Sequence, residues 1–162
     1  MKTAFKLLLA VLAMLVSPVT APAADAPGEL DPKKILEAIP KELLKDIAGN
    51  AAKRKEAIDA ASQKLQEKYR DQAGSRTIRV RNANKSNGRY YAHAEEERVR
   101  VSGTNFTVYF SFYFDESENE KAAKIEPGDR VTASGKAFVT LHGSSSSNYT
   151  SITIHVNDAK LK

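Results

Sequence analysis

The sequence predicts an α+β protein in which N-terminal helices precede an antiparallel β-domain of five strands. Up to about residue 72, apolar residues recur every three or four positions, which is typical of amphipathic helices. Beyond Gly74-Ser75 they alternate with polar residues, which is typical of half-buried strands. In residues 105–114, N-F-T-V-Y-F-S-F-Y-F, the apolar side chains share one face and the hydroxyl-bearing side chains share the other. The two patterns together define the fold class.

The first residues have the pattern of an export signal. Lys2 and Lys6 precede the apolar run 7–16, and Ala21-Pro22-Ala23 provides a small-x-small cleavage site. The run is too short to span a bilayer, which needs about 20 residues, although a retained anchor is the alternative. We expect a signal peptide over 1–23 and a periplasmic or secreted protein. Because the chain has no cysteine, it can form neither a disulfide nor a lipoprotein anchor.

The net charge of the chain does not predict strong binding to polyanions. The chain has 25 lysines and arginines against 20 acidic residues, a net charge of +5. Loss of Lys2 and Lys6 with the signal would leave a net charge of +3. We therefore do not expect nucleic acid as the natural partner, and only a local basic patch could bind an anionic ligand. No apolar run after the signal is long enough to span a membrane.

The segment 24–75 is predicted to be helical after a short lead. Asp31-Pro32 is a helix start, with a capping carboxylate followed by proline at the first helical position. Pro40 is expected to divide the following stripe into two short helices. A further helix is predicted from Ala51 to about Gln72. The stripe residues that need a partner surface are Leu36, Ile39, Leu43, Ile47, Ile58, Ala61, Leu65 and Tyr69.

The segment 76–162 is predicted to form the β-domain. Its five expected strands cover residues 77–81, 98–101, 105–114, 130–141 and 151–156. Long loops are expected at 82–91 and 142–149. The charged connection 115–124 can hold a short helical turn.

A set of turn and strand residues in this segment resembles small exported bacterial OB-fold domains. The resemblance is carried by the glycine-aspartate turn and the glycine-bearing fourth strand, with residues Ile125, Gly128, Asp129, Val131 and Gly135, and by the closing segment 154–161. It implies a five-stranded antiparallel OB-like β-barrel over residues 76–162. A lipid-binding or sandwich-like β-domain is the alternative.

The resemblance also implies a ligand surface, because OB-folds bind on the outer face of their second and third strands. Here that face would carry Arg98, Arg100, Tyr109 and Tyr113. Cations beside aromatic rings suit nucleic acid backbones with stacked bases, and they suit acidic or neutral sugars equally well.

The sequence indicates no catalytic residue, metal site or cofactor. The three consecutive carboxylates at 95–97 alternate between the two faces of a strand, so they do not form an acid-base pair. His93, His142 and His155 lie on separate elements without a metal-ligand spacing. We therefore do not expect an enzyme.

Two hypotheses remain for the function. In the first, the chain is an exported non-enzymatic binding or interaction module that contacts a glycan, an anionic ligand or an envelope protein through this face. In the second, it is a structural or accessory envelope protein whose helices cover the face and mediate protein-protein or self association. Solvent access to Tyr109 and Tyr113 separates the two hypotheses.

Overall fold

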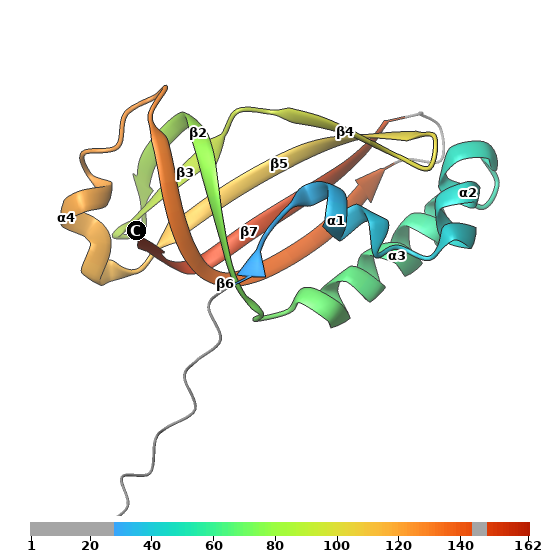
Figure 1. The fold of residues 1–162 in the computed structure, drawn as a ribbon, viewed down its shortest axis with the longest axis horizontal. Coiled ribbons are helices and arrows are strands. Elements are labelled where there is room, and N and C mark those ends of the chain that lie inside the picture. The colour runs from blue at the N-terminus through green and yellow to red at the C-terminus, as the bar shows by residue number, and fades with distance from the viewer. Residues whose placement is uncertain (1–27, 144–148) are drawn as a thin grey trace, which may run out of the picture.

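The computed structural model describes residues 28–143 and 149–162, so the expected signal peptide at 1–23 lies outside the described residues. The described chain is a mixed α+β structure with four α-helices and one seven-stranded sheet (Figure 1). The helices are α1 (Pro32–Glu37), α2 (Lys41–Gly49), α3 (Arg54–Tyr69) and α4 (Asn119–Ala122), with a 3₁₀ turn, η1 (Glu116–Glu118). The strands are β1 (Gly28–Glu29), β2 (Ala73–Ser86), β3 (Arg89–Ala94), β4 (Glu97–Val101), β5 (Thr104–Phe114), β6 (Arg130–Gly143) and β7 (Thr150–Leu161).

The predicted helix boundaries at Asp31 and Pro40 are confirmed. The Asp31 carboxylate accepts a hydrogen bond from the backbone N–H of Lys33 at 2.8 Å, which caps α1. Pro40 separates α1 from α2 and occupies the N-cap position of α2. None of the helices in the described ranges combines the length and apolar character needed to cross a bilayer.

The sheet is closed on itself by strand pairing. Its strand order is β1-β2-β3-β5-β7-β6, and β2 also pairs with β6. The strands β2, β3, β5, β7 and β6 therefore form a ring. Beyond the end of β3, β4 continues the pairing with β5. Such a ring leaves few exposed strand edges.

The predicted number of five strands is wrong, because the sheet has seven. Residues 82–91, expected to be a long loop, form the end of β2, a tight turn and the start of β3. Asn87 and Gly88 both have positive φ in that turn, at 49° and 80°. Backbone hydrogen bonds between β2 and β3 stabilise this hairpin. Its residues 84–89 include no apolar side chain, so they show no alternation of apolar and polar residues. β1 adds two residues in the segment expected to be a lead.

The expectation of a purely antiparallel sheet with only N-terminal helices is also wrong. β5 pairs with β7 in parallel, and β1 pairs with β2 in parallel. A parallel pair needs a crossover connection. Here η1, α4 and β6 form it, and α4 lies at the opposite end of the sheet from α2 and α3 (Figure 1). The helical turn anticipated within 115–124 is thus present.

The inner face of the sheet and the helices share one core. Phe106, Phe110, Phe112 and Phe114 of β5 are all buried in it. The apolar stripe of α3 packs against β6. The predicted stripe residues of the helical segment that are buried in this core are Leu36, Ile39, Ile47, Ile58, Ala61 and Leu65. The predicted partner surface of the helices is therefore the phenylalanine face of the sheet.

Gly135 allows β6 to cross β7 closely. A Cβ at this position would meet the backbone oxygen of Asn157 and would lie 3.0 Å from the Cα of Ala159. The register of the β6–β7 pair shifts at the same place. The glycine noted in the sequence thus permits the curvature with which the sheet closes.

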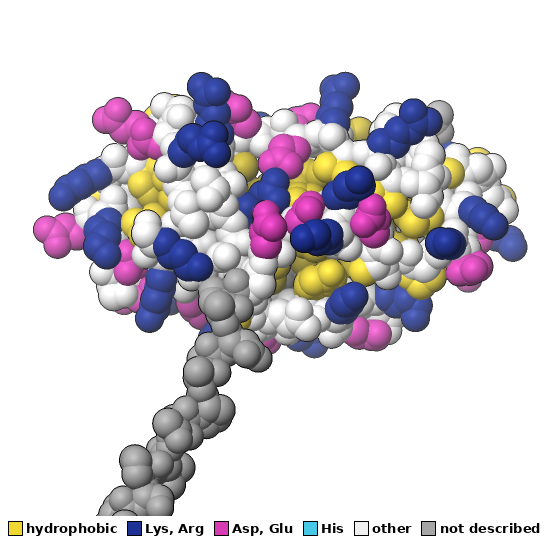
Figure 2. All heavy atoms as spheres, viewed as in Figure 1, with side chains coloured by type: hydrophobic (Ala, Val, Ile, Leu, Met, Phe, Trp, Pro, Cys, Tyr) yellow, Lys and Arg dark blue, Asp and Glu magenta, His cyan; other side chains and the backbone are white. Residues whose placement is uncertain are grey.

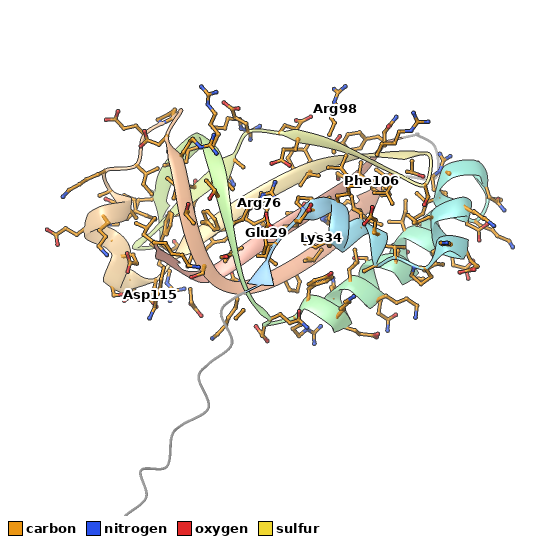
Figure 3. All side chains as sticks on the ribbon, viewed as in Figure 1. Glu29, Lys34, Arg76, Arg98, Phe106 and Asp115 are labelled. Atoms are coloured by element: carbon orange, nitrogen blue, oxygen red, sulfur yellow. The ribbon has the colours of Figure 1, made fainter. Side chains whose placement is uncertain are left out.

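An ion pair joins β2 to β4 where these two strands diverge. The Arg76 guanidinium donates hydrogen bonds to both carboxylate oxygens of Glu97, at 2.7 and 2.9 Å, and to the carbonyl oxygen of Leu30. It also lies 5.6 Å from the centre of the Phe110 ring. Figure 3 shows Arg76 behind the segment from β1 to α1, which passes across this part of the sheet. Arg76 therefore ties the N-terminal segment to the sheet.

Candidate ligand-binding surface

The side chains of β5 that point away from the core define an outer face. Strand register places outward residues of neighbouring strands in rows across it. One row contains Arg100 and Asn105, and the next contains Arg98, Thr107 and Ser151. The later rows are Tyr109, Thr153 and Thr140, then His93, Ser111, His155 and Phe138, then Tyr91 and Tyr113.

Four aromatic rings gather at one end of this face, and we call them the ring cluster: Tyr91, His93, Tyr113 and His155. The ring centres of Tyr91 and Tyr113 lie 6.0 Å apart. Those of Tyr91 and His93 lie 5.0 Å apart, and those of Tyr113 and His155 lie 5.3 Å apart. The planes are tilted by 33° to 61°, so the cluster has an uneven surface rather than one flat platform.

Ser111 lies between the two histidines of the ring cluster and is buried beneath them. Its hydroxyl is 2.6 Å from Nδ1 of His93 and shares a hydrogen bond with it. Burial lowers the pKa of His93, and the positive charge of Arg81 lowers it further. Burial also lowers the pKa of His155, with smaller contributions from His93 and His142. Both imidazoles therefore bind a proton less readily than an ordinary histidine does.

Tyr109 lies midway along the outer face and contacts the start of β7. Its hydroxyl is 2.6 Å from the hydroxyl of Tyr149. This hydrogen bond is the main reason that the pKa of Tyr109 is raised, because it stabilises the protonated phenol. Tyr149 is 49% exposed and is the most accessible of these rings. The pair places two phenols beside the arginine rows.

Arg98 and Arg100 occupy the other end of the face. Both are exposed, and Figure 3 shows Arg98 pointing away from the molecule while Phe106 lies within it. Within residues 28–143 and 149–162, Arg81, Arg98 and Arg100 have no ion-pair partner. Arg79, by contrast, pairs with Glu95 at 3.3 Å. The outer face therefore carries cations that are available to a ligand.

Two depressions open on this face. One, of about 430 Å³, is bordered by Arg89 and the ring cluster, with lining residues Ser86, Asn87, Arg89, Tyr91, His93 and Tyr113. The other, of about 410 Å³, lies at the arginine end, with lining residues Glu96, Arg98, Val99, Arg100, Asn105, Phe106, Thr107, Tyr149 and Thr150. Each is large enough for one small ring with its substituents.

The four residues expected from the sequence divide between these two places. Arg98 and Arg100 line the arginine-end depression, and Tyr109 reaches it through its bond to Tyr149. Tyr113 lines the other depression. Strand register brings Tyr91, His93 and His155 to the same face, and the hydrogen bond to Tyr109 joins Tyr149 to it; none of these four was predicted from the sequence as a site residue. The alternation of Tyr91 and His93 with Ala92 and Ala94 was a signal that could have identified the first two.

The helices and the tyrosines lie on opposite faces of β5. The apolar stripe of α3 packs against β6 and belongs to the same buried core as Phe110 and Phe112 of the inner face. Tyr109 and Tyr113 on the outer face are half-exposed. A ligand can therefore reach both rings.

The described residues show no arrangement that could hold a metal ion through three or more histidine or acidic side chains. Within the part of the chain that the structure describes, one serine–histidine hydrogen bond lies on this face, between Ser111 and His93, and Ser111 is buried. Its hydroxyl is covered, so it is poorly placed to attack a substrate. The chemistry that this surface can offer is binding by rings, hydroxyl groups and guanidinium groups.

Neither a protein-family model nor a curated protein sequence matches this chain. Among solved structures, it is similar to a Plasmodium falciparum SSB in complex with ssDNA. That similarity has 14% sequence identity and a TM-score of 0.32, and it covers 56% of this chain and 93% of that chain.

Proposed function

We propose that this chain is an exported, non-enzymatic binding module that uses the outer face of an OB-like β-barrel. In this interpretation the ring of strands β2, β3, β5, β7 and β6 is the barrel, and β3 and β4 together form its second strand. The strand order, the parallel β5–β7 pair and the helix α4 between β5 and β6 support this interpretation. The outer face of the second and third barrel strands is the usual ligand surface of such a barrel.

One observation carries the proposal: half-exposed aromatic rings and unpaired arginines share the face that the helices leave open. A protein that used this face only for packing would cover it. The opposite face of the same strand is buried in that way, in a core that it shares with the helices and the neighbouring strands. Export to the periplasm or the medium is part of the proposal and is supported by the signal pattern of residues 1–23.

The binding free energy available from the aromatic rings alone is too small for tight binding. A stacked aromatic side chain contributes about 1 to 3 kcal/mol per ligand ring, so two rings give an affinity near the millimolar range. Arg98 and Arg100 can add charge-assisted hydrogen bonds, which are about twice as strong as neutral ones. We therefore expect rings and guanidinium groups to bind the same ligand.

The test is a binding screen of the purified chain against immobilised glycans, other anionic ligands and oligonucleotides. The double variant Tyr109→Ala with Tyr113→Ala is expected to keep its circular dichroism spectrum and to lose retention on any ligand that the unmodified chain binds. Tyr69→Ala removes a ring from the helical side and serves as the matched control, with retention unchanged. Full retention by the double variant would contradict the proposal.

A further inference from the structure

The positive charge on the outer face is not cancelled by the protein itself. Arg76 and Arg79 on β2 have carboxylate partners, whereas Arg81 on the same strand has none among the described residues. The positive charge of Arg81 reaches both His93 and Tyr109, since it lowers the pKa of each. Strand register places Arg81 at the shift between Val80 and Asn82, next to His93 and Ala94 of β3 and thus beside the ring cluster.

The depression at the arginine end also carries net positive charge. Arg98 and Arg100 line it together with one carboxylate, Glu96. The negative charge of Glu96 contributes to the raised pKa of Tyr109, so this carboxylate acts on the same part of the outer face. Two guanidinium groups nevertheless outnumber the single carboxylate. A ligand that crosses the outer face would meet unpaired positive charge beside the ring cluster and at the arginine end.

The distance between the two ends requires a ligand longer than one ring. Arg98 lies opposite Thr107, and Tyr113 lies six residues further along β5. A strand rises about 3.3 Å per residue, so this separation is about 20 Å. Only a linear oligomer can contact the arginines and the ring cluster at the same time.

The surface between the two ends favours sugars over bases. Its accessible outward groups are the hydroxyls of Thr153 and Thr140 and the phenol of Tyr109. Hydroxyl groups both donate and accept hydrogen bonds, as sugar hydroxyls do. The tilted rings of the cluster do not form the flat platform on which successive bases stack.

We propose that the ligand is a linear acidic oligosaccharide that lies along β5, with its anionic groups at Arg81, Arg98 and Arg100 and its sugar rings against Tyr109 and Tyr113. This inference rests on the proposed function, because it names the ligand class of the same face. A linear chain that engages both ends at once gains effective concentration at the second end. Binding is therefore expected to depend on ligand length and on ligand charge.

The experiment is calorimetric titration of the purified chain with oligogalacturonates from the dimer to the octamer. The affinity is expected to rise with length until the oligomer spans both ends, and then to level off. Arg98→Ala with Arg100→Ala is expected to lower the affinity for the octamer about tenfold or more, since two charge-assisted contacts are lost. Lys41→Ala with Lys45→Ala on α2 removes the same charge elsewhere and is expected to leave the affinity unchanged.

Two neighbouring arginines of β2 provide a finer control. Arg81→Ala is expected to weaken binding several-fold, because its charge is unpaired. Arg79→Ala is expected to change it little, because that guanidinium already pairs with Glu95. Added salt is expected to weaken binding of the octamer, since the contacts are exposed charge pairs.

Other ligands separate this inference from the proposed function. Fully methyl-esterified oligogalacturonate keeps the sugar chain and removes its charge, and an oligothymidylate of equal charge replaces the sugars by nucleotides. Equal or tighter binding of either one, still lost in the double variant Tyr109→Ala with Tyr113→Ala, would overturn the acidic-oligosaccharide inference and leave the binding module standing. An unmodified chain that binds no ligand in these titrations or in the screen would overturn both.

Discussion

The two faces of β5 are built from alternate residues of the same strand and differ in almost every physical property. The inner face carries phenylalanines that are at most 3% exposed, and they pack against helices and neighbouring strands. The outer face carries Tyr109 and Tyr113, which are partly exposed, with Ser111 between them and Thr107 before Tyr109. The inner face therefore contributes most of the packing that stabilises the fold, and the side chains of the outer face are available for contact with a ligand. Substitutions on the two faces should therefore separate stability from binding.

Phe112→Ala is expected to have the largest effect on stability. Phe112 is fully buried, and its ring contacts those of Phe110 and Phe114. Removing a buried phenylalanine ring leaves a cavity and costs about 3 to 5 kcal/mol. Denaturant unfolding would measure the loss. Tyr113→Ala, one residue further on the opposite face, is the matched control and should cost about 1 kcal/mol. Equal losses for the two variants would break the comparison.

Glu97→Gln is expected to have the second largest effect. Glu97 holds the Arg76 guanidinium, whose side chain is only 16% exposed, so the substitution leaves a largely buried charge without its carboxylate. The expected cost is about 1 to 3 kcal/mol in the free energy of unfolding. Glu95→Gln removes the partner of Arg79, and both of those side chains are more than half exposed. That variant should change stability by less than about 1 kcal/mol. A larger loss for Glu95→Gln would show that exposure does not distinguish the two pairs.

Acidification is expected to weaken the folded state through the histidines of the ring cluster. Burial holds the pKa of His93 and His155 below the ordinary value, so the folded protein binds fewer protons than the unfolded chain. Stability is therefore full above about pH 6.5 and falls as the pH drops from there toward the lowered pKa values. Denaturant unfolding between about pH 7 and pH 5 would measure the change. The double variant His93→Gln with His155→Gln should show a weaker dependence in this window, and an unchanged dependence would contradict the assignment.

Tyr149→Phe is expected to have the smallest effect. It removes the hydroxyl that bonds to Tyr109, and this bond is the main reason for the raised pKa of the Tyr109 phenol. Titration of phenolate absorbance should show one tyrosine that ionises at lower pH than in the unmodified chain. The fold should be unaffected, because both hydroxyls lie on the outer face. An unchanged titration would mean that the two phenols do not interact in solution.

Several parts of the fold could be predicted because their causes are local. Asp31 caps a helix that begins at the next residue, and Pro40 separates two helices, through backbone effects that act within a few residues. The hairpin at Asn87-Gly88 escaped prediction even though an asparagine-glycine pair is a turn signal. The residues that flank the turn directly, Lys85, Ser86 and Arg89, are all polar, and the alternation of β3 begins only beyond them.

The candidate site was predictable only in part, for a similar reason. Alternation along β5 and β4 places Tyr109, Tyr113, Arg98 and Arg100 on one face, and the structure has them there. The row of His93, Ser111 and His155 draws its members from β3, β5 and β7, which are far apart in the sequence. The ring cluster depends on that row.

The sequence alone specifies which way each side chain of β5 points, where α1 and α2 begin, and that phenylalanines fill the interior, whereas the helix expected from Ala51 to about Gln72 is the shorter α3, Arg54–Tyr69. These are consequences of a two-residue strand repeat and of short-range backbone chemistry. Three features come from the tertiary structure alone: β5 pairs with β7 in parallel, Arg76 meets Glu97 beside the N-terminal segment, and three further rings gather around Tyr113. Register between distant strands follows from closing the whole sheet around one core, and no local pattern contains that information.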